Sequence, residues 1–368
     1  MNAAPERKHY DAVVVGAGLI GLACAWRASQ RGLSVLVIDR DGPGAGASSV
    51  AAGMLAPVTE AEFGEEAMLA LNLAAVESWG AFADELGDEL HYRTPGALVV
   101  AADRDDAEEL RRLHEFQRSL GLDAQWLVPS ECRRLEPALS PRCAGGILAP
   151  QDHQVDPVAV VSALAARVPE VLVGQPVAAV EDGGVRLASG QTIEAEQVVL
   201  AAGCWSGCAI EGVSAPPVRP VKGQILALRR PLDRPLADRL IRTPRCYVVD
   251  RGDGRVVLGA TVEERGFDTT VTGDGVYRLL EAAWEVLPDV AELEFVEARA
   301  GLRPGTPDNA PLVGRAEVPG VIWASGHYRN GVLLAPITGD AVAELLTGGE
   351  LPAELAPFGP ERFGAGVT

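Results

Sequence analysis

Three glycines near the start of the chain have the spacing of a dinucleotide-binding turn. Gly16, Gly18 and Gly21 follow a run of β-branched residues and open a helical segment. The first glycine permits a tight turn, the second lets the backbone approach a pyrophosphate, and the third lets helix and strand pack closely. The helix N-terminus offers unpaired N–H groups to phosphates. Asp39 ends the next strand, where its carboxylate can accept hydrogen bonds from ribose hydroxyls. The sequence therefore predicts dinucleotide binding.

The segment that follows this unit is made almost entirely of small residues. Residues 44–54 read Gly-Ala-Gly-Ala-Ser-Ser-Val-Ala-Ala-Gly-Met. A segment of this kind can run along a flat, extended cofactor without steric conflict. The glycine pattern by itself does not separate NAD from FAD, and this second segment favours FAD.

Hydrophobic patterns place these motifs on an α/β framework. Continuous apolar runs predict buried parallel strands at 11–15, 34–39, 197–203 and 321–325. Amphipathic patterns predict helices at 19–31, 66–86, 104–120, 157–168, 274–286 and from the loop after 325 to about 347. Shorter segments predict further strands at 96–101, 223–228, 246–250, 255–260 and 293–299, with a β-meander within 171–200.

The order of these elements predicts two domains. Parallel strands occur at the start, middle and end of the chain, with antiparallel segments between them, so the nucleotide-binding domain is expected to be discontinuous. We assign residues 1–85, 141–215 and 301–368 to it. We assign residues 86–140 and 216–300 to an inserted substrate-binding domain with an antiparallel sheet.

Composition narrows the classes of partner. The formal net charge of -19 argues against nucleic acid and anionic membrane surfaces, which repel an acidic protein. The longest apolar stretch, 12–26, is too short to span a bilayer, and residues 1–10 do not resemble a signal peptide. Six cysteines and five histidines form no cluster with metal-ligand spacing, so we expect no metal site. Reduced thiols in a cytoplasmic protein are the simplest interpretation.

Four stretches of the chain resemble the FAD-dependent D-amino acid oxidase superfamily, and within it the glycine oxidases of thiamine synthesis. They are residues 10–22, 46–57, 300–308 and 326–336, of which the last two are the more specific to glycine oxidases. The resemblance implies a Rossmann-like FAD-binding domain of the GR2 type and non-covalent FAD. It also implies oxidation of glycine with O2 as acceptor, peroxide as product, an imine supplied to thiazole synthesis, and a homotetramer.

The resemblance also implies roles for residues along the cofactor. Those that match positions contacting the adenosine and pyrophosphate half are Leu19, Ile20, Asp39, Arg40 and, through its backbone, Val177. Those that match positions along the ribityl chain and isoalloxazine are Ala47, Ser48, Ala52, Gly53, Met54, Ala202 and Gly203. Those that match the loop around the flavin pyrimidine are His327, Tyr328, Arg329, Asn330, Gly331, Val332 and Leu333. Because this loop precedes a helix, its N–H groups can stabilise negative charge on reduced flavin.

Three residues are implied to contact the substrate. Arg303 lies at the end of a strand in Ala-Gly-Leu-Arg-Pro-Gly, and a guanidinium can bind a carboxylate with two parallel hydrogen bonds. Tyr247 matches the tyrosine whose hydroxyl joins that carboxylate, and Arg329 matches an arginine near flavin and substrate. An apolar pocket would favour the neutral amine from which hydride leaves Cα, so no general base is expected.

Several alternatives stay open at this level. The enzyme could be an oxidase or a dehydrogenase, could act on sarcosine or D-amino acids outside thiamine synthesis, or could bind flavin without catalysis. A nicotinamide-dependent dehydrogenase would not explain residues 46–57 and 326–336. Val262 matches a position that lines the substrate pocket, where a small side chain would admit larger substrates. The acidic residues Glu60, Glu62, Glu65 and Glu66 either border the entrance or form a solvated helix start.

Overall fold

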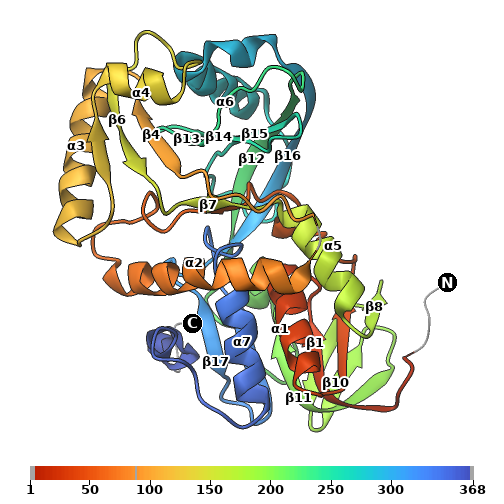
Figure 1. The fold of residues 1–368 in the computed structure, drawn as a ribbon. Helices are drawn as coiled ribbons and strands as arrows, with labels where there is room; N and C mark the ends of the chain where they lie inside the picture. Colours follow the sequence, from red (N-terminus) through yellow and green to blue (C-terminus); the bar gives the residue numbers. More distant parts are fainter. Residues whose placement is uncertain (1–4, 88, 365–368) are drawn as a thin grey trace.

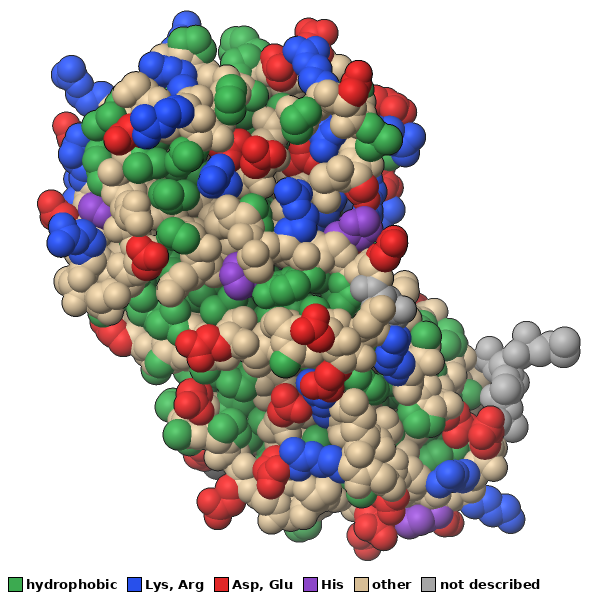
Figure 2. Space-filling view, viewed as in Figure 1, with side chains coloured by type: hydrophobic (Ala, Val, Ile, Leu, Met, Phe, Trp, Pro, Cys, Tyr) green, Lys and Arg blue, Asp and Glu red, His purple; other side chains and the backbone are tan. Residues whose placement is uncertain are grey.

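The computed structural model describes residues 5–87 and 89–364 and has two lobes (Figure 1). Each lobe is built on one eight-stranded sheet, and a two-stranded sheet of β3 (Met54–Leu55) and β7 (His153–Gln154) completes the set among the described residues. Figure 2 shows a narrower waist between the lobes, with acidic and basic side chains scattered over both. Residues 1–4 and 365–368, which the sequence assigns to the nucleotide-binding domain, lie outside the described residues.

The first sheet contains the predicted parallel strands. Its order is β17-β18-β11-β1-β2-β8, and β10 joins β11 to β9. Its strands are β1 (His9–Val15), β2 (Val35–Asp39), β8 (Val171–Val173), β9 (Val177–Glu181), β10 (Gly184–Leu187), β11 (Thr192–Leu200), β17 (Leu312–Arg315) and β18 (Val321–Ser325). β1 pairs in parallel with β2 and β11, and β11 pairs in parallel with β18. Parallel strands of this kind end at one edge, where ligands of α/β proteins bind.

Both faces of the first sheet are covered, which explains its unbroken apolar strands. Alternate side chains of β1, such as Ala12 and Val14, pack against the helices on one face. Val13 and Val15 pack on the other face with Val180, Val185 and other residues of the β9–β10 hairpin. The α-helices of the chain are α1 (Leu19–Gln30), α2 (Glu66–Leu86), α3 (Arg104–Ser119), α4 (Pro129–Leu135), α5 (Pro157–Arg167), α6 (Gly273–Val286) and α7 (Ala335–Leu346).

The second sheet forms the other lobe and is mostly antiparallel. Its order is β16-β12-β15-β14-β13-β4-β6-β5, in which only β13 and β4 pair in parallel. Its strands are β4 (Ala97–Ala101), β5 (Gln125–Leu127), β6 (Gly145–Ala149), β12 (Arg219–Arg229), β13 (Leu240–Arg242), β14 (Tyr247–Asp250), β15 (Arg255–Gly259) and β16 (Glu294–Gly305). The long pair β12–β16 extends from this lobe toward the waist, and α6 and α3 pack against the sheet. The predicted α/β class with an inserted antiparallel sheet is confirmed.

Sheet membership differs from the predicted domain limits at two places, in β6 and at the end of β16. β6 pairs with β4 and β5 of the second sheet, although the predicted limit at residue 141 assigns it to the nucleotide-binding domain. Its sequence, Gly-Gly-Ile-Leu-Ala, has no alternation that would reveal which sheet it joins. β16 also extends beyond the predicted strand 293–299 and carries Arg303 inside its pairing with β12. The division into domains stays a prediction.

Two general properties of the described part of the chain concern its surroundings. None of its helices combines the length and apolar character that a membrane crossing requires. It also holds no group of three His, Cys, Asp or Glu side chains placed to bind a metal ion.

Candidate active site

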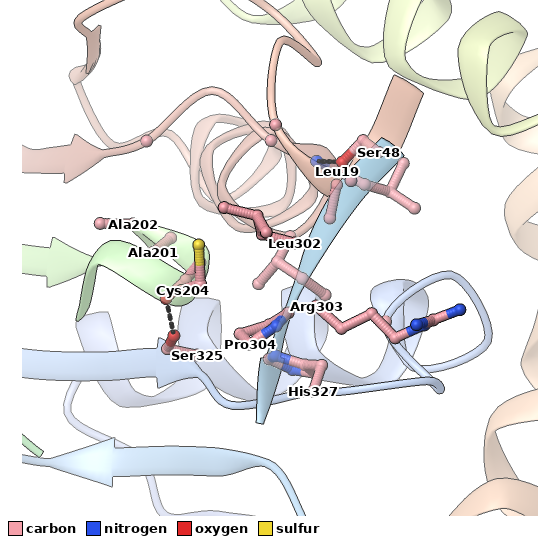
Figure 3. Close-up of a pocket in the computed structure, with 18 of the residues that line it drawn as sticks. Leu19, Ser48, Ala201, Ala202, Cys204, Leu302, Arg303, Pro304, Ser325 and His327 are labelled. Carbon is pink, nitrogen blue, oxygen red and sulfur yellow. Dashed lines mark hydrogen bonds between the residues drawn. The ribbon is translucent and has the colours of Figure 1, made fainter. Parts of the chain in front are cut away.

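A cavity of about 430 Å³ extends between the two sheets. Its wall includes the β1–α1 turn, the ends of β2 and β11, the small-residue segment 45–56, β12, β14, β16 and the loop before α7. Figure 3 shows residues of five segments around the same pocket: Leu19, Ser48, Ala201 with Ala202 and Cys204, residues 302–304, and Ser325 with His327. The sequence segments with predicted cofactor and substrate roles therefore meet in one place.

Nearly all of the predicted site residues contribute to this wall. Two of them, Gly21 and Leu333, do not line the cavity. Leu333 is buried, and its carbonyl oxygen accepts a hydrogen bond of 2.9 Å from Trp79 Nε1. Both residues therefore contribute to the packing behind the cavity wall. The assigned roles remain predictions, because position on a wall does not identify a ligand atom.

The glycine turn has the shape that close approach of a pyrophosphate requires. Gly16 has φ +111°, and a Cβ there would lie 2.4 Å from Ala201 O. A Cβ on Gly21 would lie 1.9 Å from Gly16 O, so helix α1 packs directly on the turn. A Cβ on Gly18, by contrast, would meet only Ser48 Oγ, at 3.6 Å, and would occupy space at the cavity. These contacts fit the three roles expected of the glycines.

Asp39 combines a structural role with free acceptor capacity. Its Oδ2 accepts from Ala17 N at 2.7 Å, and its Oδ1 accepts from Asp41 N at 2.8 Å and Gly42 N at 2.7 Å. A carboxylate has about four lone-pair sites, so a ribose hydroxyl can still donate to it. Asp39 therefore stabilises the β1–α1 turn and also lines the cavity.

The small-residue segment is held from both lobes. Ser48 Oγ accepts a hydrogen bond of 3.0 Å from Leu19 N. Arg251, in the hairpin after β14, is buried and donates to Ala52 O and Val155 O, each at 2.5 Å. Burial lowers the pKa of Arg251 to about 10, which leaves the guanidinium charged at neutral pH. These two hydrogen bonds could not be predicted from the sequence, because Arg251 is far from residue 52 along the chain.

The loop before α7 is anchored by a neutral histidine. His327 is buried, its Nε2 lies 3.0 Å from Thr338 Oγ1, and burial lowers its pKa to about 3. Tyr328 N donates to Pro304 O at 3.0 Å, which joins this loop to β16. Pro336 lies in the first turn of α7, where its missing N–H leaves no intrahelical hydrogen bond unmade.

Arg303 and Tyr247 lie together in the substrate-facing part of the cavity. Arg303 Nη1 donates to Thr261 O at 3.2 Å and to Lys222 O at 3.5 Å. Among residues 5–87 and 89–364, no carboxylate forms an ion pair with its guanidinium. Tyr247 is the first residue of β14, and burial raises the pKa of its hydroxyl. Arg303 and Tyr247 both line the cavity, and the positive charge of Arg303 partly offsets the rise in the Tyr247 pKa.

Two glycines of the second sheet make room for these side chains. A Cβ on Gly223 would lie 2.3 Å from Arg303 Nη1, and a Cβ on Gly259 would lie 2.2 Å from the Tyr247 hydroxyl. Each glycine thus lets a long polar side chain lie flat against a neighbouring strand. Their importance depends on sheet register, which the sequence did not reveal.

Arg329 has different surroundings from Arg303. It forms an ion pair with Glu62, and its Nε lies 3.8 Å from Glu60 Oε2. Glu60 Oε1 in turn accepts from Arg242 Nη1 at 2.6 Å. Burial opposes ionisation of Glu60, but Arg242 and Arg329 outweigh it and hold its pKa below the usual value.

Glu60 is a wall residue that sequence reasoning undervalued. Its side chain is 11% exposed and lines the cavity, so it is no part of a solvated helix start. The turn before it is fixed by buried Asp152, which accepts from Val58 N at 3.0 Å and Thr59 Oγ1 at 2.6 Å. Val262, by contrast, was predicted to line the substrate pocket, and the structure shows otherwise. It is 60% exposed and is absent from the cavity wall.

Comparison with known proteins identifies the class to which this cavity belongs. The model of the family "FAD dependent oxidoreductase" matches residues 11–345. The chain belongs to that family, and FAD is its cofactor.

Individual relatives resemble the chain over nearly its whole length. The glycine oxidase of Geobacillus kaustophilus (strain HTA426) is 35% identical over 370 residues, covering 96% of this chain and 97% of the relative. The crystal structure of glycine oxidase from Geobacillus kaustophilus superposes with a TM-score of 0.90 at 33% identity, covering 97% of this chain and 99% of that one. The bifunctional protein ThiO/ThiG of Synechocystis sp. is 33% identical over 96% of this chain and 54% of its own length.

Proposed function

We propose that this enzyme oxidises the amine of glycine, with sarcosine and small D-amino acids as the substrates to compare. The observation that carries the proposal is Arg303, a cation without a carboxylate partner in the described chain, beside the Tyr247 hydroxyl on the cavity wall. A guanidinium in this state binds a carboxylate with charge-assisted hydrogen bonds. The glycine oxidases among the relatives support the assignment to a small amino acid.

The protein groups orient the substrate and govern its protonation. Arg303 and Tyr247 bind the carboxylate, which leaves Cα and the amine directed into the cavity. Arg242 and Arg329 balance the carboxylates of Glu60 and Glu62, so this part of the wall carries no net negative charge that would favour an ammonium, and desolvation in the cavity then favours the neutral amine. FAD held along the cavity wall would supply the hydride-accepting chemistry, with O2 as the final oxidant and hydrogen peroxide as its product.

Anaerobic titration tests this proposal directly. Purified protein with FAD should lose its yellow colour when glycine is added without oxygen, and air should restore the colour with formation of peroxide. A flavin that is reduced by glycine but not reoxidised by air would identify a dehydrogenase. A flavin that no small amino acid reduces would refute the proposal, and preference for sarcosine or D-alanine would reassign the substrate.

The proposal extends to the cell and to the assembly. The ThiO/ThiG relative supports delivery of the imine product to thiazole synthesis. Six free cysteines among the described residues support a reducing, cytoplasmic location. FAD is bound non-covalently in our assignment, because the last cysteine of the chain, Cys246, precedes the segment 326–336 that matches the flavin loop. β16 is an edge strand with exposed Phe295 and Val296, and such an apolar edge supports a homo-oligomer, with a tetramer as the expected size. Light scattering of the purified enzyme would measure that size, and a monomer at micromolar concentration would refute it.

A further inference from the structure

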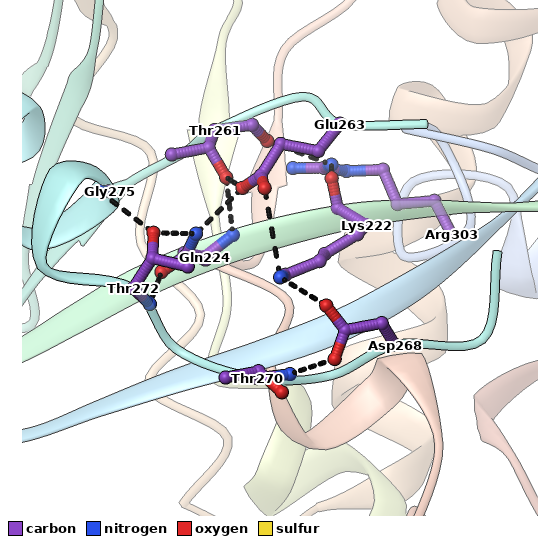
Figure 4. A network of polar contacts seen from close by, with 9 residues as sticks. All are labelled: Lys222, Gln224, Thr261, Glu263, Asp268, Thr270, Thr272, Gly275 and Arg303. Atoms are coloured by element: carbon purple, nitrogen blue, oxygen red, sulfur yellow. Dashed lines mark hydrogen bonds and ion pairs between the residues drawn. The ribbon is translucent and has the colours of Figure 1, made fainter. Parts of the chain in front are cut away.

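Lysine is rare in this chain, and one of its lysines is buried. Lysine and arginine total 32, of which only Lys8 and Lys222 are lysines. The Lys222 side chain, on β12, is 1% exposed. Its Nζ lies 3.2 Å from Asp268 Oδ2 and 3.7 Å from Glu263 Oε2 (Figure 4). Burial of an ammonium is costly unless carboxylates pair with it, so this position calls for a functional explanation.

Both carboxylates belong to residues 261–272, the segment between β15 and α6, which we call the strap. Lys222 and Glu263 exchange main-chain hydrogen bonds of 2.9 and 3.0 Å. The Gln224 side chain donates to Glu263 Oε1 at 2.7 Å and accepts from Thr272 N at 2.9 Å. The strap is therefore attached to β12 at its beginning and its end, and the Lys222–Asp268 pair holds its middle.

The first residue of the strap is also a partner of Arg303. Thr261 O accepts from Arg303 Nη1 at 3.2 Å, and the other acceptor of that atom is Lys222 O. Thr261 itself is fixed through its hydroxyl, which donates to Glu263 at 2.6 Å and accepts from Gln224 N at 2.9 Å. Figure 4 shows the guanidinium at the edge of this network. Arg303 is thus directed by two carbonyl oxygens whose positions depend on the network.

The middle of the strap contacts the cofactor side of the cavity. The Phe267 ring stacks on Trp205, with centroids 6.0 Å apart and planes at 25°. Arg40 lies over the same Trp205 ring, 3.9 Å from its centroid, and both Arg40 and Trp205 line the cavity. One segment therefore spans from the substrate arginine to the wall near the predicted adenosine end.

We propose that Lys222 is a positioning residue for substrate binding. Its ammonium fixes the strap through Asp268 and Glu263, and the strap then holds the Arg303 guanidinium in the direction that binds the substrate carboxylate. This inference rests on the proposed function, because it requires Arg303 to bind that carboxylate. Lys222 acts without contacting the substrate, so its loss affects substrate affinity more than the rate of the bound complex.

Asp268→Asn is the first test, because Asp268 is 46% exposed and the change preserves its shape. The matched control is Asp274→Asn, which breaks the exposed ion pair with Arg278 on α6. We expect Asp268→Asn to raise the KM for glycine about fivefold to tenfold, with kcat within about twofold and FAD affinity unchanged. The control should leave all three quantities unchanged.

Substitution of the lysine itself gives a larger effect and a rescue. Lys222→Met should raise KM about tenfold or more, and Lys222→Arg, which keeps the charge, should recover part of the loss. An amine-reactive ester provides a second readout, because the chain has only two lysines. In the wild type Lys8 should react and Lys222 should be protected, and Asp268→Asn should increase the reaction at Lys222.

The outcomes separate this inference from the proposed function. Unchanged KM in a folded Asp268→Asn enzyme would refute the role of Lys222, even if the wild type oxidises glycine. A rise in KM accompanied by equally large decreases in kcat and in FAD affinity would also refute it. Such a result would mean that the network only maintains the fold. If the wild-type flavin is not reduced by glycine, the proposed function fails first. If Lys222→Met does not fold, Asp268→Asn decides.

Discussion

The two halves of the cavity are built by different means. The cofactor half uses backbone and small side chains: the β1–α1 turn, the segment 45–56 and the ends of β2 and β11. The substrate half uses long charged side chains from separate elements, namely Arg303 on β16 and Arg329 and Glu60 on two loops. The first half suits an extended molecule that fits closely along it, and in our proposal the second half binds a small molecule by charge. A local sequence motif is therefore enough to specify the cofactor half, whereas the substrate half forms only where segments distant in the sequence meet.

The comparison is sharpest within the charged half itself. Arg329 is paired with Glu60 and Glu62, whereas Arg303 donates to two carbonyl oxygens and forms no ion pair with a carboxylate among the described residues, although Glu60 interacts with it beyond ion-pair distance. A guanidinium already paired with carboxylates gains little from another one. Two arginines on the same wall therefore have different tasks, and the unpaired one is suited to hold substrate.

Disruption of the glycine turn should produce the largest effect. In Gly21→Val the new side chain would enter the space of Gly16 O, where even a Cβ would lie at 1.9 Å. We expect FAD binding to weaken about 100-fold or more, a cost of roughly 3 kcal/mol. Titration of apoprotein with FAD measures this loss. Gly80→Ala on α2, where a Cβ meets nothing within 4 Å, is the control. Normal FAD affinity in Gly21→Val would contradict the backbone account of the cofactor half.

Removal of the two arginines should separate their roles. Arg303→Met should raise the KM for glycine roughly 30-fold to several hundred-fold, because it loses charge-assisted hydrogen bonds worth roughly 2–4 kcal/mol. Arg329→Met should change KM by less than about fivefold, as expected for an arginine with its own carboxylate partners. Steady-state kinetics at saturating FAD give both values. The reverse ranking would overturn the comparison between the two arginines.

His327 should make the stability of the enzyme depend on acid pH. Burial lowers its folded pKa from 6.5 to about 3, so the unfolded chain takes up a proton first as pH falls. Between pH 7 and pH 5 this group alone should cost about 2 kcal/mol of stability. Denaturant unfolding of the holoenzyme at the two pH values should show that His327→Gln reduces the difference by that amount. An equal pH dependence in both proteins would exclude a neutral buried His327.

Val262→Phe should have the smallest effect. The side chain is 60% exposed, so enlarging it should leave the ratio of kcat/KM for glycine and sarcosine unchanged. Ile225→Phe is the contrasting variant, since Ile225 is buried and lines the cavity. A change of selectivity at position 262 would mean that the strap closes inward during catalysis.

The sequence predicted the cofactor half well because its signals are local. The apolar run before Gly16, the glycine spacing and the small-residue segment lie within the first 57 residues, and each acts through its neighbours in the chain. The sequence missed β6 as a member of the second sheet, because its short glycine-rich run carries no periodicity. The sequence also predicted that Val262 lines the substrate pocket, although it is exposed, and it did not decide whether Glu60 is exposed or lines the cavity. Both depend on which residues pack against a side chain in the fold.

The sequence alone was enough to predict a dinucleotide-binding α/β protein and the glycines that should approach its cofactor. The folded structure was needed to show that Arg303 forms no ion pair with a carboxylate among the described residues, that Glu60 pairs with two arginines, and that Lys222 is buried. The physical reason is that backbone conformation is set by nearest neighbours along the chain, whereas the charge state of a side chain is set by its neighbours in space.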